Sequence, residues 1–525
     1  MMAHSLIRKG LCAACLCSLP LAVVPACAAT PQTEPNAVAF TVTDFEVVGD
    51  NPLGGKRAAE ILHPFVGPQH GIDGLQHAAQ ALEQALHAAG YALYRVTVPP
   101  QSIDDRVRLQ VSAATLGKVD IQANRYFDAD NVARSLPELR SGQTPNLARL
   151  ARSIALANQN PARTLAVTMR PAAAPDQVDA QVGVDGRQPY SLMLRADNSG
   201  NDMPAASRTS LLLQHANLFG RDHVATAVYT TSPEAPAAVR QYGLFYSVPV
   251  YAWGGTLSTY GFHSDVNSGD IQGVYAVRGS GTFYGLDYTQ MLLPRGAWRQ
   301  SLKLGVDDKL FRDQTQFSGT PIGSDVRSRP VTMSYVARYE SLASQGSLSL
   351  SYVHNLGGGG HAGDADYALV RNGARANWDL WRLQGSYSHR LTDAYSMVVR
   401  LTGQHAYQPL IGGEQFGYGG QDSLRGINQR QVLGDSGVQG SVELWGPPLW
   451  QNIRLLGFVD AGRVWREQPS VGTPARESAA STGIGLRWSR PDRAELQVDY
   501  GHLLNGITGT PSGHSRIDVA LTLHI

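Results

Sequence analysis

Residues 516–525 read RIDVALTLHI, and this stretch decides the fold of the larger part of the chain. Apolar side chains occupy every second position: Ile517, Val519, Leu521, Leu523 and Ile525. Charged, polar or small residues lie between them, beginning with Arg516 and Asp518. Successive side chains of a strand point to opposite faces. One apolar face and one charged face are typical of a strand with lipid outside and water inside. The stretch therefore predicts a transmembrane β-strand.

The same alternation continues upstream of this stretch. Residues 482–488 and 494–500 repeat it, and Gly, Asp, Asn and Pro turns separate such segments from residue 190 onward. We count about 16 segments, and single-chain bacterial barrels have an even number of strands. We therefore expect an all-β transmembrane barrel of about 16 antiparallel strands over residues 187–525. Soluble β-sandwiches also alternate and are the alternative on pattern alone.

The first residues of the chain predict export. His4, Arg8 and Lys9 precede an apolar run over residues 11–24, and Ala26-Cys27-Ala28 follows as a small-x-small cleavage site. The run is shorter than the roughly 20 apolar residues that span a bilayer as a helix. We expect a signal peptide over residues 1–28, with lipid attachment at Cys27 as the alternative. All four cysteines lie in this segment, so disulfides would not stabilise the mature chain.

Two stretches between the signal and the barrel share one order of elements. Residues 40–113 predict a strand at 40–48, helices at 56–62 and 72–89, and strands at 91–98 and 106–111. Residues 114–186 predict a strand at 116–121, helices at 129–136 and 147–157, and strands at 164–169 and 178–184. A repeated β-α-α-β-β unit indicates two α+β domains of one kind, preceded by a short segment at 29–39.

Composition and motifs argue against several function classes. A formal net charge of +1 and 17% charged residues disfavour a nucleic-acid partner. The spacing Gly358-x-Gly360-x-x-Gly363 matches a dinucleotide fingerprint, but no predicted helix follows it, so we interpret it as a barrel loop. No catalytic set and no metal-ligand spacing is present. We expect neither an enzyme nor a cofactor.

One long loop, residues 409–437, is rich in glycine and contains the sequence Ser423-Leu424-Arg425-Gly426-Ile427. Further on, residues 457–462 read GFVDAG within a predicted strand, and alternation turns Phe458 and Asp460 toward the lumen. A carboxylate inside the barrel needs water or a cation. A bidentate ion pair with Arg425 would hold an inward-folding loop in place. On these residues alone, an Arg-Gly pair in an ordinary polar loop is the alternative.

These features, in this order, resemble the two-partner secretion transporters, which export haemolysins and filamentous haemagglutinins and belong to the POTRA-containing barrel superfamily. The resemblance covers residues 40–525, and the two α+β units resemble POTRA domains. It implies that Leu424, Arg425, Gly426 and Ile427 form the tip of a lumenal loop. It also implies that Arg425 pairs with Asp460, in the strand that carries Phe458 and Gly462.

This chain departs from the family pattern at three places. Leu424 and Ile427 stand where Val and Phe are usual, and Ile525 replaces the common terminal aromatic residue. Residues 29–39 are too few for the plug helix that many members carry. We therefore expect the resting pore to be closed in another way or to stay partly open.

The resemblance implies an outer-membrane protein whose POTRA domains lie in the periplasm. Its partners would be an unfolded exoprotein of the adhesin or haemolysin type, outer-membrane lipid and the barrel-insertion machinery. POTRA domains would bind the exoprotein by adding a strand to a sheet edge. A barrel-assembly factor of the same superfamily is the main alternative, followed by a passive porin and an outer-membrane enzyme.

Overall fold

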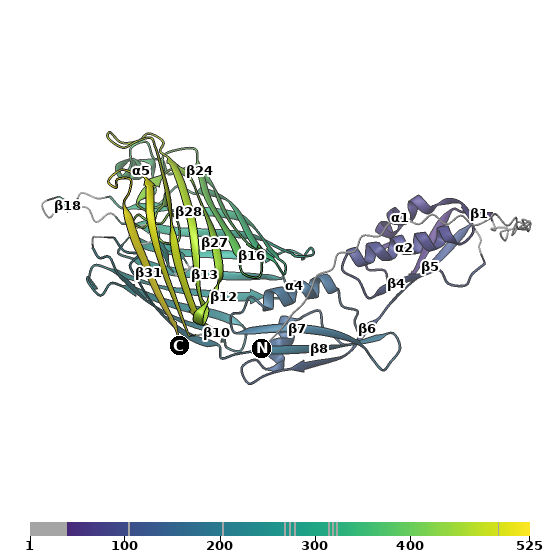
Figure 1. The fold of residues 1–525 in the computed structure, drawn as a ribbon. Coiled ribbons are helices and arrows are strands. Elements are labelled where there is room, and N and C mark those ends of the chain that lie inside the picture. Colours follow the sequence, from purple (N-terminus) through teal and green to yellow (C-terminus); the bar gives the residue numbers. More distant parts are fainter. Residues whose placement is uncertain are drawn as a thin grey trace, which may run out of the picture.

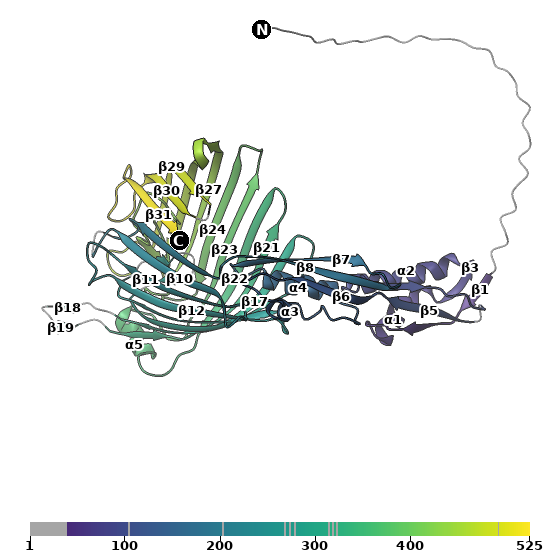
Figure 2. The same ribbon diagram turned by 90° about the horizontal axis from the view of Figure 1, so that it is seen from below.

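The computed structural model describes residues 39–525 except 103–104, 202–203, 267–268, 272–274, 278–279, 313–315, 318–319, 322–323 and 492. The expected signal peptide, the lipidation site at Cys27 and almost all of residues 29–39 lie outside the described residues. The described chain forms two small α+β units followed by a barrel, with the second unit against one end of the barrel (Figure 1, Figure 2).

The first unit contains two helices and a three-stranded sheet. Its elements are β1 (Ala39–Val42), β2 (Asp44–Gly49), α1 (Gly55–Leu62), β3 (Gly67–His70), α2 (Asp73–Ala88), β4 (Tyr94–Thr97) and β5 (Arg106–Ala113). The sheet order is β2-β5-β4, with β2 parallel to β5. Leu75, Ala79, Leu82 and Leu86 are buried along α2, as the helical spacing predicts.

Two strand predictions for this unit were wrong in extent. The expected strand at 40–48 is broken at Thr43, because β1 pairs with β3 while β2 pairs with β5. The expected strand at 91–98 begins only at Tyr94. Gly90 has a φ of 94°, and the Tyr91 N–H donates to the carbonyl of Leu86, which is a glycine-dependent helix ending.

The second unit follows its predicted order closely. Its elements are β6 (Thr115–Gln122), α3 (Ala129–Ser135), α4 (Leu147–Ala157), β7 (Arg163–Pro171) and β8 (Gln177–Gly186), with sheet order β6-β8-β7. Asp128 and Asn146 accept backbone N–H groups at the starts of α3 and α4. Such side-chain caps satisfy N–H groups that the helix itself cannot.

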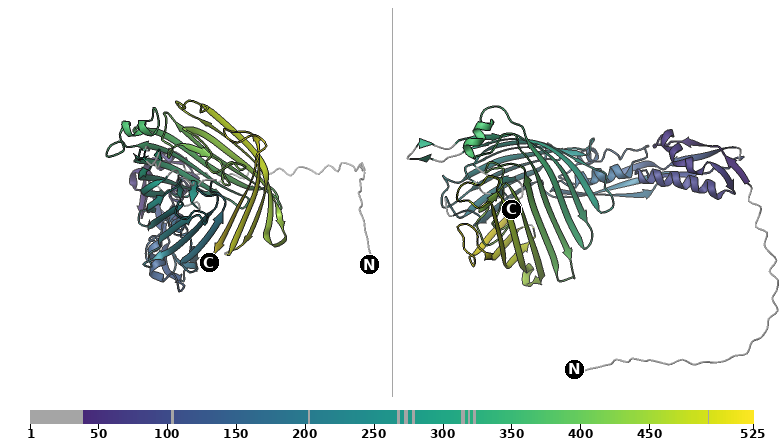
Figure 3. Two further views of the ribbon diagram at one scale, coloured as in Figure 1. Left: turned by 90° about the vertical axis from the view of Figure 1, so that its left-hand side faces the viewer. Right: turned by 90° about the horizontal axis from the view of Figure 1, so that it is seen from above.

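The barrel strands run antiparallel and close on themselves (Figure 3). They are β9 (Tyr190–Asp197), β10 (Arg208–Leu218), β11 (His223–Thr231), β12 (Arg240–Val250), β13 (Gly255–Ser264), β16 (Gly281–Met291), β17 (Trp298–Phe311), β20 (Val326–Ser328), β21 (Pro330–Glu340), β22 (Ser344–Asn355), β23 (Asp379–Arg390), β24 (Ser396–Ala406), β27 (Ser436–Leu449), β28 (Ile453–Trp465), β29 (Arg476–Arg490), β30 (Ala494–Asn505) and β31 (Ser515–His524). Both β20 and β21 pair with β17 and are successive parts of one strand. Within the described residues the barrel therefore has 16 strands, the predicted number.

The alternation that predicts the barrel is visible in its burial. In β31, Ile517, Val519 and Leu521 lie exposed on the outer wall, whereas Asp518, Ala520 and Thr522 are buried inside. The apolar wall suits lipid, and the inward carboxylate finds a partner in Arg516 at 2.7 Å.

Four short strands lie in connections between barrel strands: β14 (Gly269–Ile271), β15 (Tyr275–Val277), β18 (Gln316–Phe317) and β19 (Thr320–Pro321). Strands β18 and β19 lie at the barrel end away from the second unit (Figure 2). The expectation that no helix follows Gly363 was wrong, because α5 (Asp364–Val370) begins directly after it. However, α5 connects β22 to β23, which are antiparallel neighbours, so the strand–helix–parallel-strand context of a dinucleotide site is missing. No helix in the described part of the chain is long and apolar enough to cross a membrane.

Candidate functional site

The predicted long loop folds into the barrel. We call residues 409–437 the inner loop; its last two residues already belong to β27. It carries a small hairpin of β25 (Phe416–Tyr418) and β26 (Val432–Gly434), which pair antiparallel. Its tip residues Leu424 and Ile427 are fully buried. A loop buried in this way needs partners for its polar groups.

Arg425 lies at the tip of the inner loop and is 2% exposed. Its Nε and Nη2 donate to the two carboxylate oxygens of Asp460, at 2.8 and 2.7 Å. The backbone N–H of Arg425 also donates to Asp460, at 3.1 Å. The planar guanidinium suits this two-point contact, which fixes the direction as well as the position of the tip.

Further groups complete the surroundings of Arg425. Its Nη1 donates to Glu443 at 2.8 Å, its Nη2 donates to the Ser441 hydroxyl at 3.0 Å, and Asp499 lies 3.7 Å from Nη1. Glu443 also pairs with Arg400, and Asp499 pairs with Arg487, each at 2.9 Å. The cluster thus balances three carboxylates, all buried, against buried Arg425 and the more exposed Arg400 and Arg487, which reduces the large cost of burying the carboxylates alone.

The other predicted site residues lie around this cluster. The Phe458 ring centroid is 3.4 Å from the Arg425 guanidinium carbon, a stacked cation–π contact. Gly462 lies under the Tyr418 ring, where an added Cβ would come within 3.0 Å of a ring carbon. Leu424 and Ile427, the two departures from the family pattern, pack in one apolar cluster beneath the hairpin.

Gly426 faces the barrel wall at close range. Its φ is 97°, a conformation that favours glycine, and an added Cβ would lie 3.3 Å from the carbonyl of Gly501. Conversely, a Cβ on Gly501 would lie 2.5 Å from the Gly426 nitrogen. The tip therefore fits against β30 only because both positions lack a side chain.

Sequence reasoning missed part of this site. Asp499 lies between Val498 and Tyr500 in the alternating stretch 494–500, and Glu443 lies between Val442 and Leu444, so alternation turns both carboxylates inward. Alternation identifies the wall on which a charge lies but not its partner, since the partners come from three different strands.

A second polar cluster joins the second unit to the barrel. Arg163 and Asp222 have side chains that are 0% and 2% exposed, and they pair at 2.7 Å. The Tyr251 hydroxyl donates to Asp222 at 2.7 Å, and the Asn131 amide donates to its other oxygen at 3.0 Å. Burial and the neighbouring Asp222 raise the pKa of Tyr251, which keeps the phenol a donor. We call these four residues the joint.

The joint sets the second unit at the barrel mouth. A cavity of about 1580 Å³ lies between α4 and the barrel wall. Ile154, Asn158 and Gln159 line it from the second unit, and Ser347, Ser386 and other polar side chains line it from the barrel. Helix α4 therefore forms part of the wall of this cavity. Figure 2 shows α4 beside the end of the barrel. In the described part of the chain, no group of three or more His, Cys, Asp and Glu side chains is placed to hold a metal ion.

Comparison with known proteins adds to this geometry. The family model described as "Haemolysin secretion/activation protein ShlB/FhaC/HecB" matches residues 177–488, and that described as "POTRA domain, ShlB-type" matches residues 40–113. The outer membrane transporter CdiB of Dickeya dadantii (strain 3937) is 21% identical over 416 residues, covering 76% of this chain and 72% of the relative. The outer membrane transporter CdiB-2 of Burkholderia pseudomallei (strain 1026b) is 23% identical over 473 residues, covering 86% and 77%.

Two solved structures share the fold. CdiB from Escherichia coli has a TM-score of 0.71 at 17% identity, over 97% of this chain and 94% of that structure. CdiB from Acinetobacter baumannii has a TM-score of 0.69 at 17% identity, over 93% and 90%. The first family match spans more than half of the chain. The chain belongs to the haemolysin secretion/activation family ShlB/FhaC/HecB, and is thus an outer-membrane transporter of two-partner secretion with its N-terminal POTRA region in the periplasm.

Proposed function

We propose that this protein exports one unfolded partner exoprotein, of the adhesin or haemolysin type, through its barrel lumen. The observation that carries this proposal is the cavity at the periplasmic mouth, walled by α4 on one side and by barrel strands on the other. A polypeptide guided along the second unit arrives directly at the lumen. Export needs no nucleotide at this membrane, because folding of the partner outside biases the direction of movement.

We further propose that residues 40–113 and 114–186 are two POTRA domains that capture the partner by strand addition. The sheet order β2-β5-β4 leaves edges at β2 and β4, and the order β6-β8-β7 leaves edges at β6 and β7. Unpaired edge groups bind an extended chain through main-chain hydrogen bonds, largely independently of its sequence.

The polar wall of the entrance suits passage better than tight binding. Ser347 and Ser386, which line the cavity, bond each other across β22 and β23 at 2.7 Å. Hydroxyls already paired with each other make this part of the wall polar and uncharged, and Asp287, Lys303 and Arg338 add charges of both signs elsewhere in the cavity. The partner would slide along this wall, while the inner loop, held by Arg425, narrows the path beside it.

Quantitative proteomics of the medium and the outer membrane tests the proposal. The parent strain is compared with a clean deletion and with deletions complemented by wild type, by Arg425→Ala or by Arg57→Ala. Arg57 is a matched control, because it is an exposed arginine in α1 paired with Glu60. We expect one large exoprotein to disappear from the medium on deletion, to return with wild type and Arg57→Ala, and to stay low with Arg425→Ala.

The opposite pattern would identify an assembly factor. A general fall in many outer-membrane barrels, with no single exoprotein lost, would contradict secretion as the function. Normal export by an inserted Arg425→Ala barrel would remove Arg425 from the mechanism. Insertion is checked in each strain by measuring the amount of the transporter in the outer membrane. We propose that outer-membrane lipid and the barrel-insertion machinery are its partners during insertion.

A further inference from the structure

The inner loop contains a further fully buried charge, Glu414, which lies near the start of the loop, whereas Arg425 lies at its tip. Its carboxylate lies 3.1 Å from the Lys309 ammonium and accepts a hydrogen bond from Arg382 Nη2 at 3.0 Å. The Ser328 hydroxyl also donates to it, at 3.2 Å. Glu414 is therefore held by side chains of three different strands, β17, β20 and β23.

The two buried charges Glu414 and Arg425 reach in opposite directions around the barrel. The inner loop leaves β24 and returns at β27. Glu414 reaches back to β17, β20 and β23, whereas Arg425 reaches forward to β27, β28 and β30. The loop thus spans the lumen from one arc of the wall to another.

Glu414 and Arg425 have opposite charges and lie in surroundings of opposite charge. Glu414 is an anion among cations, and Arg425 is a cation among Glu443, Asp460 and Asp499. If Glu414 lay in the site of Arg425, and Arg425 in that of Glu414, like charges would meet in buried sites, which is strongly unfavourable. The charge pattern accordingly selects one orientation of the loop across the pore.

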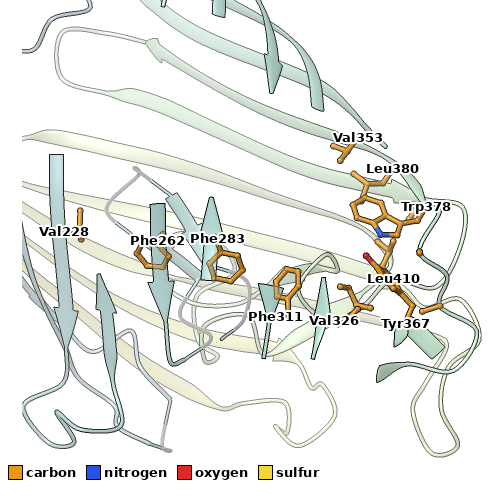
Figure 4. Packing of buried hydrophobic residues seen from close by; sticks show 14 of the residues in the cluster. Val228, Phe262, Phe283, Phe311, Val326, Val353, Tyr367, Trp378, Leu380 and Leu410 are labelled. Carbon is orange, nitrogen blue, oxygen red and sulfur yellow. The ribbon is translucent and has the colours of Figure 1, made fainter. Parts of the chain in front are cut away.

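Apolar packing beside Glu414 reinforces this end. Phe262, Phe283 and Phe311 form a row on neighbouring strands inside the barrel, and Leu410 of the inner loop packs in the same cluster (Figure 4). Gly413 rests on Phe311 so closely that an added Cβ would lie 2.1 Å from a ring carbon. The start of the loop therefore packs against the barrel wall directly beside Glu414.

Gln404 links both ends of the inner loop at its base. Its side-chain amide donates to the carbonyl of Glu414 at 2.9 Å and to the carbonyl of Asp435 at 3.0 Å. Arg371 adds a bidentate pair to Asp435, which is fully buried. The loop is consequently fixed at its base and at two charged points on separate arcs of the wall.

We propose that Glu414 is a positioning residue of the transporter: through Lys309 and Arg382 it holds the inner loop across the lumen and keeps the resting pore closed. This inference rests on the proposed function, since it assumes that the lumen is the transport path. In this proposal the inner loop, which connects two barrel strands, closes the resting pore.

Single-channel recording of the full-length protein in planar lipid bilayers tests this role without any exoprotein. Glu414→Gln keeps the size of the side chain and removes its charge. We expect the open level to be occupied at least about tenfold more often, since hydrogen bonds to charged groups contribute enough for such a factor. Glu60→Gln is the matched control, because Glu60 is an exposed carboxylate paired with Arg57 on α1. We expect it to record as wild type.

A mirrored set of charges provides the rescue. Glu414→Lys alone should open the pore more than Glu414→Gln, and adding Lys309→Glu with Arg382→Glu should return the recordings toward wild type. A loss of packing alone would not be rescued by reversing charges. Wild-type recordings from Glu414→Gln, or no recovery in an assembled triple variant, would overturn the proposal.

Assembly of each variant is checked by the shift between unheated and heated protein on a gel. If Glu414→Gln does not assemble, Arg382→Gln decides the question, because it removes one cation and leaves Lys309 in place. Wild-type recordings from assembled Arg382→Gln would then overturn the proposal. If Glu414→Gln opens the pore but the wild-type protein exports no exoprotein, the role of Glu414 stands and the proposed function is contradicted.

Discussion

Arg425→Ala should release the tip of the inner loop from the barrel wall. The substitution removes the two-point contact with Asp460 and the bonds to Glu443 and Ser441. It leaves Asp460 and Asp499, both 0% exposed, with one cation fewer, so the cluster changes from neutral to one net negative charge. Removing one partner of a buried ion pair costs about 3–5 kcal/mol. The undocked population of the tip should therefore rise by roughly 10²- to 4 × 10³-fold.

Hydrogen exchange of the inner-loop amides measures this population directly. Local opening sets the exchange rate of a protected amide, so the loss of docking energy appears as faster exchange in peptides from residues 409–437. Arg425→Lys keeps the charge but offers a single point of contact. It should lose about 1.5–3 kcal/mol, the contribution of one hydrogen bond to a charged group.

Protection of the barrel strands provides the internal reference for this experiment. Peptides from β22 and β23, which do not contact Arg425, should exchange as in wild type, as should every peptide of Arg57→Ala. Inner-loop protection that stays within about threefold of wild type in assembled Arg425→Ala would refute the reasoning, because threefold corresponds to less than about 1 kcal/mol. In that case packing, not the ion cluster, would hold the tip.

Three further predictions concern other parts of the chain. Arg163→Met should cost the joint about 3–5 kcal/mol, because Asp222 then stays buried without its cation; spin-label distances between α4 and the barrel should broaden, and adding Asp222→Leu should narrow them again. Gly426→Ala should cost about 1–3 kcal/mol through its positive φ, with a further loss from contact with Gly501, and should lower export without lowering insertion. Burial and the Asp50 carboxylate raise the pKa of Tyr94 to about 12. The folded unit therefore binds the phenol proton more tightly than the unfolded chain does. The stability that this proton adds is present below pH about 10, the ordinary pKa of tyrosine, and is lost as pH rises through about 12. A titration of Tyr94→Phe should lack a tyrosinate component near pH 12.

Much of the architecture could be predicted from local pattern. The inward Asp518 and the outward Ile517 follow from alternation, and the buried face of α2 follows from helical spacing. Both are properties of neighbouring residues along one element. Where a prediction failed in extent, as at Thr43 and Tyr91, the cause was a hydrogen bond to a segment outside the pattern: β3 in one case and the end of α2 in the other.

The sequence by itself determined the kind of wall that each strand presents, the repeated α+β unit and the presence of a long loop bearing Arg425. Only the tertiary structure decided which charges meet. Glu414 and Lys309 are separated by 105 residues, and Arg163 and Asp222 by 59, yet each pair is buried in contact. Alternation has a period of two and says nothing about such distances. The closing of the barrel brings these distant residues together. In a buried, low-dielectric site each ion pair is strong, so Glu414–Lys309 positions the inner loop and Arg163–Asp222 positions the second unit.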